Sequence, residues 1–254
     1  MTATDLERLR QAVQVHPEDQ EARLALLRAL VAGAYWQEAE EVGNSLRQQE
    51  TASLEVHTLL TVVYAKQERV QEAIQQCQQA LTAHPDDTLL LFNLGTLLAQ
   101  RGENDAAQET LAKAVTQHDG WAELHYNLGI VLLRQERYKE ALDAFERAAA
   151  LREDYAEAHF SCGNVHAMKG LEPNGSLDYY EIDCAIHAYK RAIQHRPGYT
   201  AALYNLGMLY GRMGSAEGRR VWEQYLEAAK SLDTETTWRM RAQEYQRDLE
   251  DRLR

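Results

Sequence analysis

Three side chains of the kinds that bind metals lie on one side of a predicted helix. His159, Cys162 and His166 stand at positions i, i+3 and i+7, and imidazole and thiolate groups with that spacing can reach a single zinc ion. The same positions belong to the packed face of the helix, and cysteine is a good small core residue. We therefore expect packing here and predict no metal site and no cofactor. A metal-binding protein is the less favoured alternative.

Sequence signatures of catalysis are missing along the chain. It has no glycine-rich phosphate loop, no H-E-x-x-H motif and no G-x-S-x-G motif. Its many Asp and Glu residues are spread over predicted solvent faces, so no carboxylate pair for acid–base chemistry stands out. We predict that the chain is not an enzyme.

Composition limits the classes of partner and compartment. The chain has 254 residues, of which 27 are Lys or Arg and 39 are Asp or Glu, so its formal net charge is −12. This acidity argues against nucleic acids, whose phosphates bind clustered Lys and Arg. No apolar run approaches the length of a membrane span, so no membrane insertion is expected, and the N-terminus lacks signal-peptide features. Three cysteines without framework spacing indicate a reducing compartment, and we predict a cytoplasmic protein.

A short motif returns at a fixed interval. FNLG at 92–95, YNLG at 126–129 and FSCG at 160–163 follow one another at 34 residues, and YNLG at 204–207 comes after a ten-residue insertion. A period of this length is typical of solenoids built from stacked helical units. Columns of Gly and Ala would let the two helices of a unit approach closely, although each mid-helix Gly weakens its helix. The aligned repeats start at 20, 54, 88, 122, 156 and 200.

The pattern resembles the tetratricopeptide repeat (TPR) family, most clearly over 122–155, AELHYNLGIVLLRQERYKEALDAFERAAALREDY. The resemblance implies an all-α fold, a right-handed α-solenoid superhelix of helix-turn-helix repeats. We accordingly expect an N-terminal capping helix over 1–19 and a repeat array over 20–230. The array should be interrupted by an insertion at 171–182 and followed by a C-terminal capping helix over 231–254.

In the repeats that start at 88, 122, 156 and 200, a second face of the first helix carries aromatic and asparagine residues, where a simple surface helix would be polar throughout. The TPR resemblance implies that this face lines a concave groove that binds peptides. Aromatic rings give contact area at small entropic cost, and an Asn amide can bond a peptide backbone. Alternatively, the rings stack on one another and the amides bond neighbouring helices. The predicted groove residues are Phe92, Asn93, Tyr126, Asn127, Ile130, Arg134, Phe160, Asn164, Tyr204, Asn205, Met208 and Arg212.

These patterns together predict a non-enzymatic scaffold or adaptor, such as a complex-assembly factor. It would hold a peptide or helix of another protein and be a monomer or weak homo-oligomer itself. The alternative is a homo-oligomerising structural protein of the same repeat type. The insertion at 171–182 agrees equally with a binding edge and with tolerated decoration.

Overall fold

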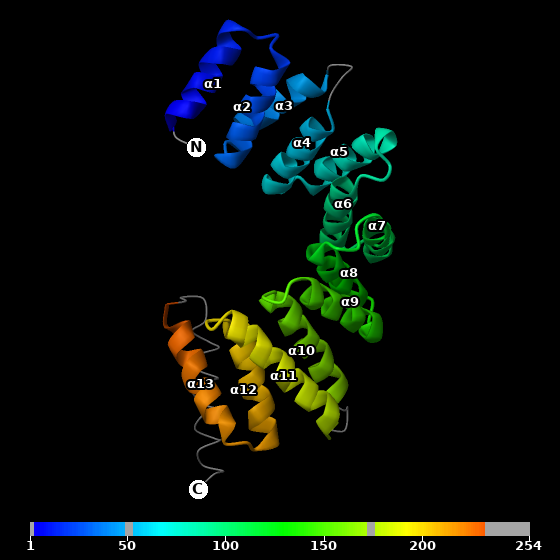
Figure 1. Ribbon diagram of the computed structural model, residues 1–254, viewed down its shortest axis with the longest axis vertical. Helices are drawn as coiled ribbons and strands as arrows, with labels where there is room; N and C mark the ends of the chain where they lie inside the picture. The colour runs from blue at the N-terminus through cyan, green and yellow to red at the C-terminus, as the bar shows by residue number, and fades with distance from the viewer. Residues whose placement is uncertain (1–2, 49–52, 172–175, 232–254) are drawn as a thin grey trace. The chain divides into compact units, whose positions relative to one another are not determined.

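The computed structural model describes residues 3–48, 53–171 and 176–231. Within these residues the secondary structure is helical, apart from one isolated antiparallel bridge between Leu171 and Leu177. The fold is all-α, a solenoid of helical repeats, as the sequence predicts. The chain divides into two units, Met1–Asp119 and Gly120–Arg254, and successive helices of each unit pack side by side (Figure 1).

The first unit contains a leading helix and three helical hairpins. Its helices are α1 (Ala3–Val15), α2 (Gln20–Ala32), α3 (Trp36–Arg47), α4 (Leu54–Lys66), α5 (Val70–Ala83), α6 (Thr88–Arg101) and α7 (Asn104–Gln117). Helix α1 packs against α2, and the Arg10 guanidinium on α1 binds the carboxylates of Glu7 and of Glu38 on α3, each at 2.6 Å.

The second unit contains three further hairpins. Its helices are α8 (Ala122–Arg134), α9 (Tyr138–Leu151), α10 (Ala156–Gly170), α11 (Tyr179–His195), α12 (Thr200–Met213) and α13 (Glu217–Ala228), followed by the 3₁₀ turn η1 (Ala229–Ser231). In both units the first helix of every hairpin begins where a repeat starts in the sequence alignment. The expected C-terminal capping helix lies outside the described residues beyond Ser231.

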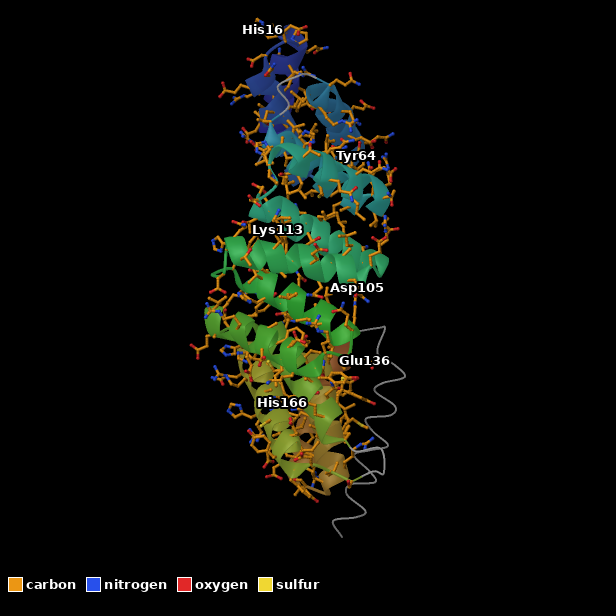
Figure 2. All side chains as sticks on the ribbon, turned by 90° about the vertical axis from the view of Figure 1, so that its right-hand side faces the viewer. His16, Tyr64, Asp105, Lys113, Glu136 and His166 are labelled. Atoms are coloured by element: carbon orange, nitrogen blue, oxygen red, sulfur yellow. The ribbon has the colours of Figure 1, made fainter. Side chains whose placement is uncertain are left out.

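Local chemistry explains where the hairpin helices begin and end. The Asp87 carboxylate accepts a hydrogen bond from the backbone N–H of Leu90 at 2.8 Å and so caps the start of α6. Gly102 ends the same helix with φ +85°, a left-handed conformation that glycine adopts without strain. The turn between α8 and α9 places Glu136 (labelled in Figure 2) at φ +61°, where a non-glycine residue pays a steric cost.

The recurring glycine of α6, α8, α10 and α12 faces a large buried side chain of the following helix. A Cβ atom on Gly129 would lie 2.7 Å from two ring carbons of Phe145, and one on Gly163 would lie 2.6 Å from the ring of Tyr189. The same relation joins Gly207 to Trp222, which fixes the register of the last repeat. Close approach of the two helices is therefore the reason for the repeated glycine, as the sequence predicts.

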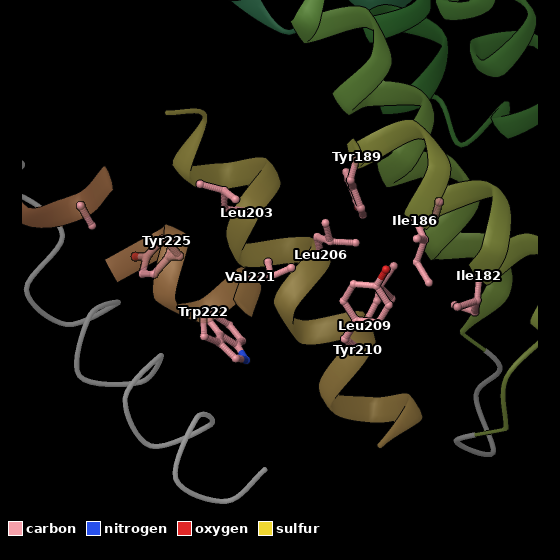
Figure 3. Close-up of a cluster of buried hydrophobic side chains, with 12 residues drawn as sticks. Ile182, Ile186, Tyr189, Leu203, Leu206, Leu209, Tyr210, Val221, Trp222 and Tyr225 are labelled. Atoms are coloured by element: carbon pink, nitrogen blue, oxygen red, sulfur yellow. The ribbon is translucent and has the colours of Figure 1, made fainter. Parts of the chain in front are cut away.

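The core of the last two hairpins is a continuous cluster between α11, α12 and α13 (Figure 3). Ile182, Leu203 and Trp222 are fully buried within it, and the rings of Tyr189 and Tyr225 are almost so. This cluster joins the helices on either side of α12, so it holds in place the face of α12 that bears Asn205.

The inserted stretch at 171–182 is partly helical, because α11 begins within it. Helix α11 begins at Tyr179 because the Asp178 carboxylate accepts hydrogen bonds from the backbone N–H groups of Tyr180 and Glu181 and so forms an N-cap. The Ile182 side chain is fully buried, so this added turn packs against the core. The residues at 172–175 lie outside the described part of the chain.

Candidate functional site

Three aromatic residues of the predicted groove face, Tyr126, Phe160 and Tyr204, pack against rings of their own unit. Tyr126 on α8 lies 5.0 Å from Tyr155 and 5.7 Å from Phe145, measured between ring centroids. Phe160 on α10 repeats this arrangement, at 5.0 Å from Tyr199. All of these side chains are at least partly buried. Stacking within the chain, the alternative considered from the sequence, therefore accounts for much of this aromatic series.

Two of the stacked rings, Tyr155 and Tyr199, are each covered by an arginine that also forms an ion pair. The Arg152 guanidinium carbon lies 3.5 Å from the centre of the Tyr155 ring, and its Nη1 donates to Glu123 at 2.6 Å. Arg196 covers Tyr199 at 4.6 Å and pairs with Glu157. These ion pairs join each arginine to the first helix of a hairpin, through Glu123 on α8 and Glu157 on α10. Together with the cation–π contacts they stabilise the packing beside the predicted groove face. The two glutamates are therefore paired within the chain.

Two asparagines of the predicted set bond each other. The side-chain oxygen of Asn164 accepts hydrogen bonds from the Tyr189 hydroxyl at 2.8 Å and from the Asn205 amide nitrogen at 2.9 Å. An amide group has one acceptor oxygen and one nitrogen with two N–H donors. The Asn164 nitrogen and the Asn205 oxygen therefore keep their capacity, since neither has another hydrogen bond in the described residues.

These asparagines line a pocket of about 420 Å³ between α10 and α12, which we call the Asn pocket. The structure brings five predicted residues together around it: Asn164, Tyr204, Asn205, Met208 and Arg212. It adds residues that the sequence analysis did not name, among them Leu133, Met168, Leu171 and Tyr189. Met168 is half exposed, at 51%, so an apolar side chain is open to solvent at this pocket.

The other predicted residues lie elsewhere. Tyr126, Asn127, Ile130, Arg134 and Phe160 belong to the second unit but do not line the Asn pocket. Phe92 and Asn93 are on α6 in the first unit. Their membership of a binding surface stays a prediction.

The three residues of the candidate metal cluster are engaged separately. The His159 Nε2 atom lies 2.9 Å from the backbone oxygen of Glu153, and the His166 Nδ1 atom lies 2.7 Å from the Glu181 carboxylate. Cys162 is buried, and loss of solvent raises the pKa of its thiol to about 12, which disfavours the thiolate that a metal needs. Among the described residues, no group of three His, Cys, Asp or Glu side chains is arranged to hold a metal ion.

A comparison with protein families identifies the hairpins. The family model described as "Tetratricopeptide repeat" matches residues 87–154. Residues 87–154 thus match tetratricopeptide repeats. The match covers the end of the first unit and the first hairpin of the second.

Several solved structures share the TPR fold with this chain. The crystal structure of MamA is 28% identical, covers 67% of this chain and 95% of that one, and superposes with a TM-score of 0.61. PilF of Pseudomonas aeruginosa has a TM-score of 0.72 at 18% identity, with 88% and 96% coverage. YrrB, "a TPR protein with an unusual peptide-binding site", has a TM-score of 0.62 at 20% identity, with 79% and 98% coverage.

Curated relatives match a smaller part. The human protein O-mannosyl-transferase TMTC1 is 33% identical over 104 residues, which are 39% of this chain and 12% of that protein. The mouse protein of the same name is 32% identical over 102 residues. The chain thus spans about an eighth of the length of these relatives. In the described residues, no helix combines the length and hydropathy needed to cross a bilayer.

The Asn pocket can form hydrogen bonds through its two asparagines and apolar contacts through the side chains beside them. Burial raises the pKa of the Tyr189 phenol above its ordinary value of 10, with a smaller opposing effect from Asn205, so the hydroxyl remains a donor to Asn164. This bond fixes the orientation of the Asn pair. Arg212 adds a cationic group that is exposed and makes no ion pair among the described residues.

Proposed function

We propose that the chain is a non-enzymatic protein-interaction scaffold whose second unit binds an extended segment of a partner protein in the Asn pocket. The observation that carries this proposal is the Asn164–Asn205 pair, held by Tyr189, with a donor and an acceptor left over. A peptide unit in an extended chain offers one N–H and one C=O. The groups of the pair are complementary to it.

The same observation favours an extended guest over a helical one. Inside an α-helix the backbone N–H and C=O groups are already bonded to each other, so a helical guest could not use the free groups of the pair. Met168 and Met208 beside the pair are flexible apolar side chains that adapt to guests of different shape. Arg212 would favour a guest with a carboxylate next to its apolar residue.

A selection from random peptides tests the proposal, because it does not require the partner to be identified first. Linear peptides displayed on phage are selected against the wild-type chain, and the affinity of the best binder is measured by calorimetry. We expect Asn205→Ala to weaken binding about tenfold, since a peptide group loses its partner in a partly buried site. Asn127→Ala is the matched control, because Asn127 has the same place on α8 but does not line the Asn pocket.

Backbone methylation separates the extended guest from the helical one. Methylating one peptide nitrogen at a time should find a position where affinity falls as much as in Asn205→Ala. Equal affinity for wild type and Asn205→Ala, or peptides whose binding improves when they are stapled as helices, would contradict the proposal. Thermal melting of each variant shows that it is folded.

A further inference from the structure

A second pocket lies on the other side of α10. It has a volume of about 510 Å³ and is formed by α9, α10 and α11. Its floor carries His159, Cys162 and His166, and α11 adds His187; we call it the His pocket. Cys162 and Asn164 are two residues apart, about 200° around the helix, so the two pockets open on different faces. His166 lies on the side of the second unit that faces the viewer in Figure 2.

The His pocket exists because α10 departs from the other first helices. The position of Cys162 is a leucine in α4, α6, α8 and α12, namely Leu60, Leu94, Leu128 and Leu206. The position of His166 is leucine or tyrosine in those helices: Tyr64, Leu98, Leu132 and Tyr210. The smaller thiol leaves space where leucine fills the other hairpins. Since leucine would bury more apolar surface, packing alone does not favour cysteine here.

Two carboxylates give this pocket a negative character. Glu146 on α9 and Asp183 on α11 both line it, are exposed, and form no ion pair within the described residues. Arg191 also lines it, but that charge is matched by Glu153, 3.1 Å from its Nη2. The chain as a whole carries a net charge of −12. The complementary ligand is therefore a cation, and the field of the chain would attract one.

The remaining lining suits a long cationic side chain. Ala149, Ala188 and Cys162 form small apolar surfaces on three helices, along which a methylene stem can lie. Tyr180 lines the mouth with 75% of its surface exposed, because the Asp178 cap places it in the first turn of α11. An exposed ring next to two carboxylates matches a guanidinium, which stacks on aromatic faces and donates five N–H groups in one plane.

We propose that the His pocket binds an arginine side chain presented by a partner protein, on a face of α10 different from that of the Asn pocket. The guanidinium lies between Glu146 and Asp183 and stacks on Tyr180. This inference does not depend on the proposed function, because the two pockets share no lining residue.

The probe is a blocked pentapeptide, acetyl-Ala-Ala-Arg-Ala-Ala-amide, titrated into the full chain and followed by NMR or calorimetry. The same peptide with citrulline, a neutral relative of arginine, should bind at least about fivefold more weakly. Free argininamide should also bind more weakly than the peptide. If citrulline binds equally, or argininamide binds as tightly as the peptide, or the arginine peptide shows no saturable binding at millimolar concentration, the proposal is wrong.

Paired variants locate the site. Asp183→Asn and Glu146→Gln should each weaken binding about fivefold, whereas Asp143→Asn, which removes the same charge from an exposed position of α9 outside the pocket, should not. Tyr180→Ala should weaken binding, and Tyr179→Ala, an exposed neighbour that does not line the pocket, should leave it unchanged.

Filling the pocket is the most direct test. Cys162→Leu restores the residue type of the other hairpins and should abolish peptide binding while the chain stays folded. Asn205→Ala, in the Asn pocket, should have no effect. If Cys162→Leu binds as well as wild type, or Asp143→Asn weakens binding as much as Asp183→Asn, the arginine does not occupy this pocket.

Discussion

Adding one methyl group at Gly129 measures how tightly a hairpin is packed. In Gly129→Ala, the new Cβ atom would lie 2.7 Å from Cδ1 and Cε1 of Phe145 and 3.1 Å from its Cζ. Carbon atoms in contact normally lie about 3.5–4.0 Å apart, so the ring or helix must move by roughly 1 Å. Phe145 is fully buried and its ring packs on Tyr126 at 5.7 Å, so it has little room to retreat.

Two energies of opposite sign then compete. Overpacking a closed core costs about 1–3 kcal/mol, whereas replacing glycine by alanine inside a helix gains about 1 kcal/mol. The net effect of Gly129→Ala should be a loss of about 0–2 kcal/mol. Gly211→Ala isolates the second energy, because Gly211 is also helical but a Cβ atom there would meet nothing within 4 Å. That variant should be stabilised.

The comparison of the two variants cancels the helix propensity. Gly129→Ala should be less stable than Gly211→Ala by about 1–3 kcal/mol, and for a chain of this length each kcal/mol shifts the melting temperature by about 2–4 °C. Circular dichroism during heating, and during urea titration to check that the transition is cooperative, measures the difference. If Gly129→Ala melts as high as Gly211→Ala, close helix approach is not the reason for the glycine.

Three further outcomes follow from burial and hydrogen bonding. Cys184 is partly exposed, whereas Cys162 is buried with its pKa raised to about 12; Cys184 should react with a thiol reagent much faster, and equal rates in the native state would contradict this packing. Burial raises the pKa of Glu181, but hydrogen bonds from a histidine and a lysine of α10 lower it more, leaving it below 4.5. A carboxylate whose pKa is lower in the folded than in the unfolded chain contributes stability above the unfolded pKa, and this contribution is lost as the pH falls. Glu181→Gln should therefore flatten the fall in stability below about pH 4.5. An unchanged pH dependence in this range would refute the prediction. Tyr189→Phe removes the donor to Asn164 and should cost about 1 kcal/mol in urea unfolding; an unchanged midpoint would mean that the bond contributes nothing.

The fold could be predicted from the sequence because the repeat encodes each contact several times. One period of 34 residues places Gly95 opposite Leu111 and Gly129 opposite Phe145, each pair 16 residues apart. A helical wheel alone also identifies the second face of the first helices, on which the predicted groove residues lie. Ala167 and Met168 lie on the same face of α10, three and four residues after Asn164. Both line the Asn pocket, so the same helical wheel indicates them as groove residues.

Other parts of the site could not be read from periodicity. Tyr189 belongs to the second helix of its hairpin and reaches the pocket only through the way α10 and α11 pack. The bond between Asn164 and Asn205 joins residues 41 positions apart, and its existence depends on the distance between α10 and α12. The first turn of α11 lies inside the stretch 171–182 that the repeat alignment leaves as an insertion, since its start depends on the Asp178 cap and not on the period.

Helix α10 shows why a departure from an internal repeat is informative. Cys162, Gly163 and Asn164 are consecutive, and steps of about 100° send them to three surfaces: the His pocket, the contact with Tyr189, and the Asn pocket. Gly163 follows the repeat and serves packing. Cys162 departs from it, and the leucines at that position in α4, α6 and α12 (Leu60, Leu94 and Leu206) are buried. Uniform packing requirements would favour leucine again, so the thiol marks a position where the chain gives up apolar burial and leaves a space. A space beside two carboxylates without ion partners is more readily explained by a cationic ligand than by stability.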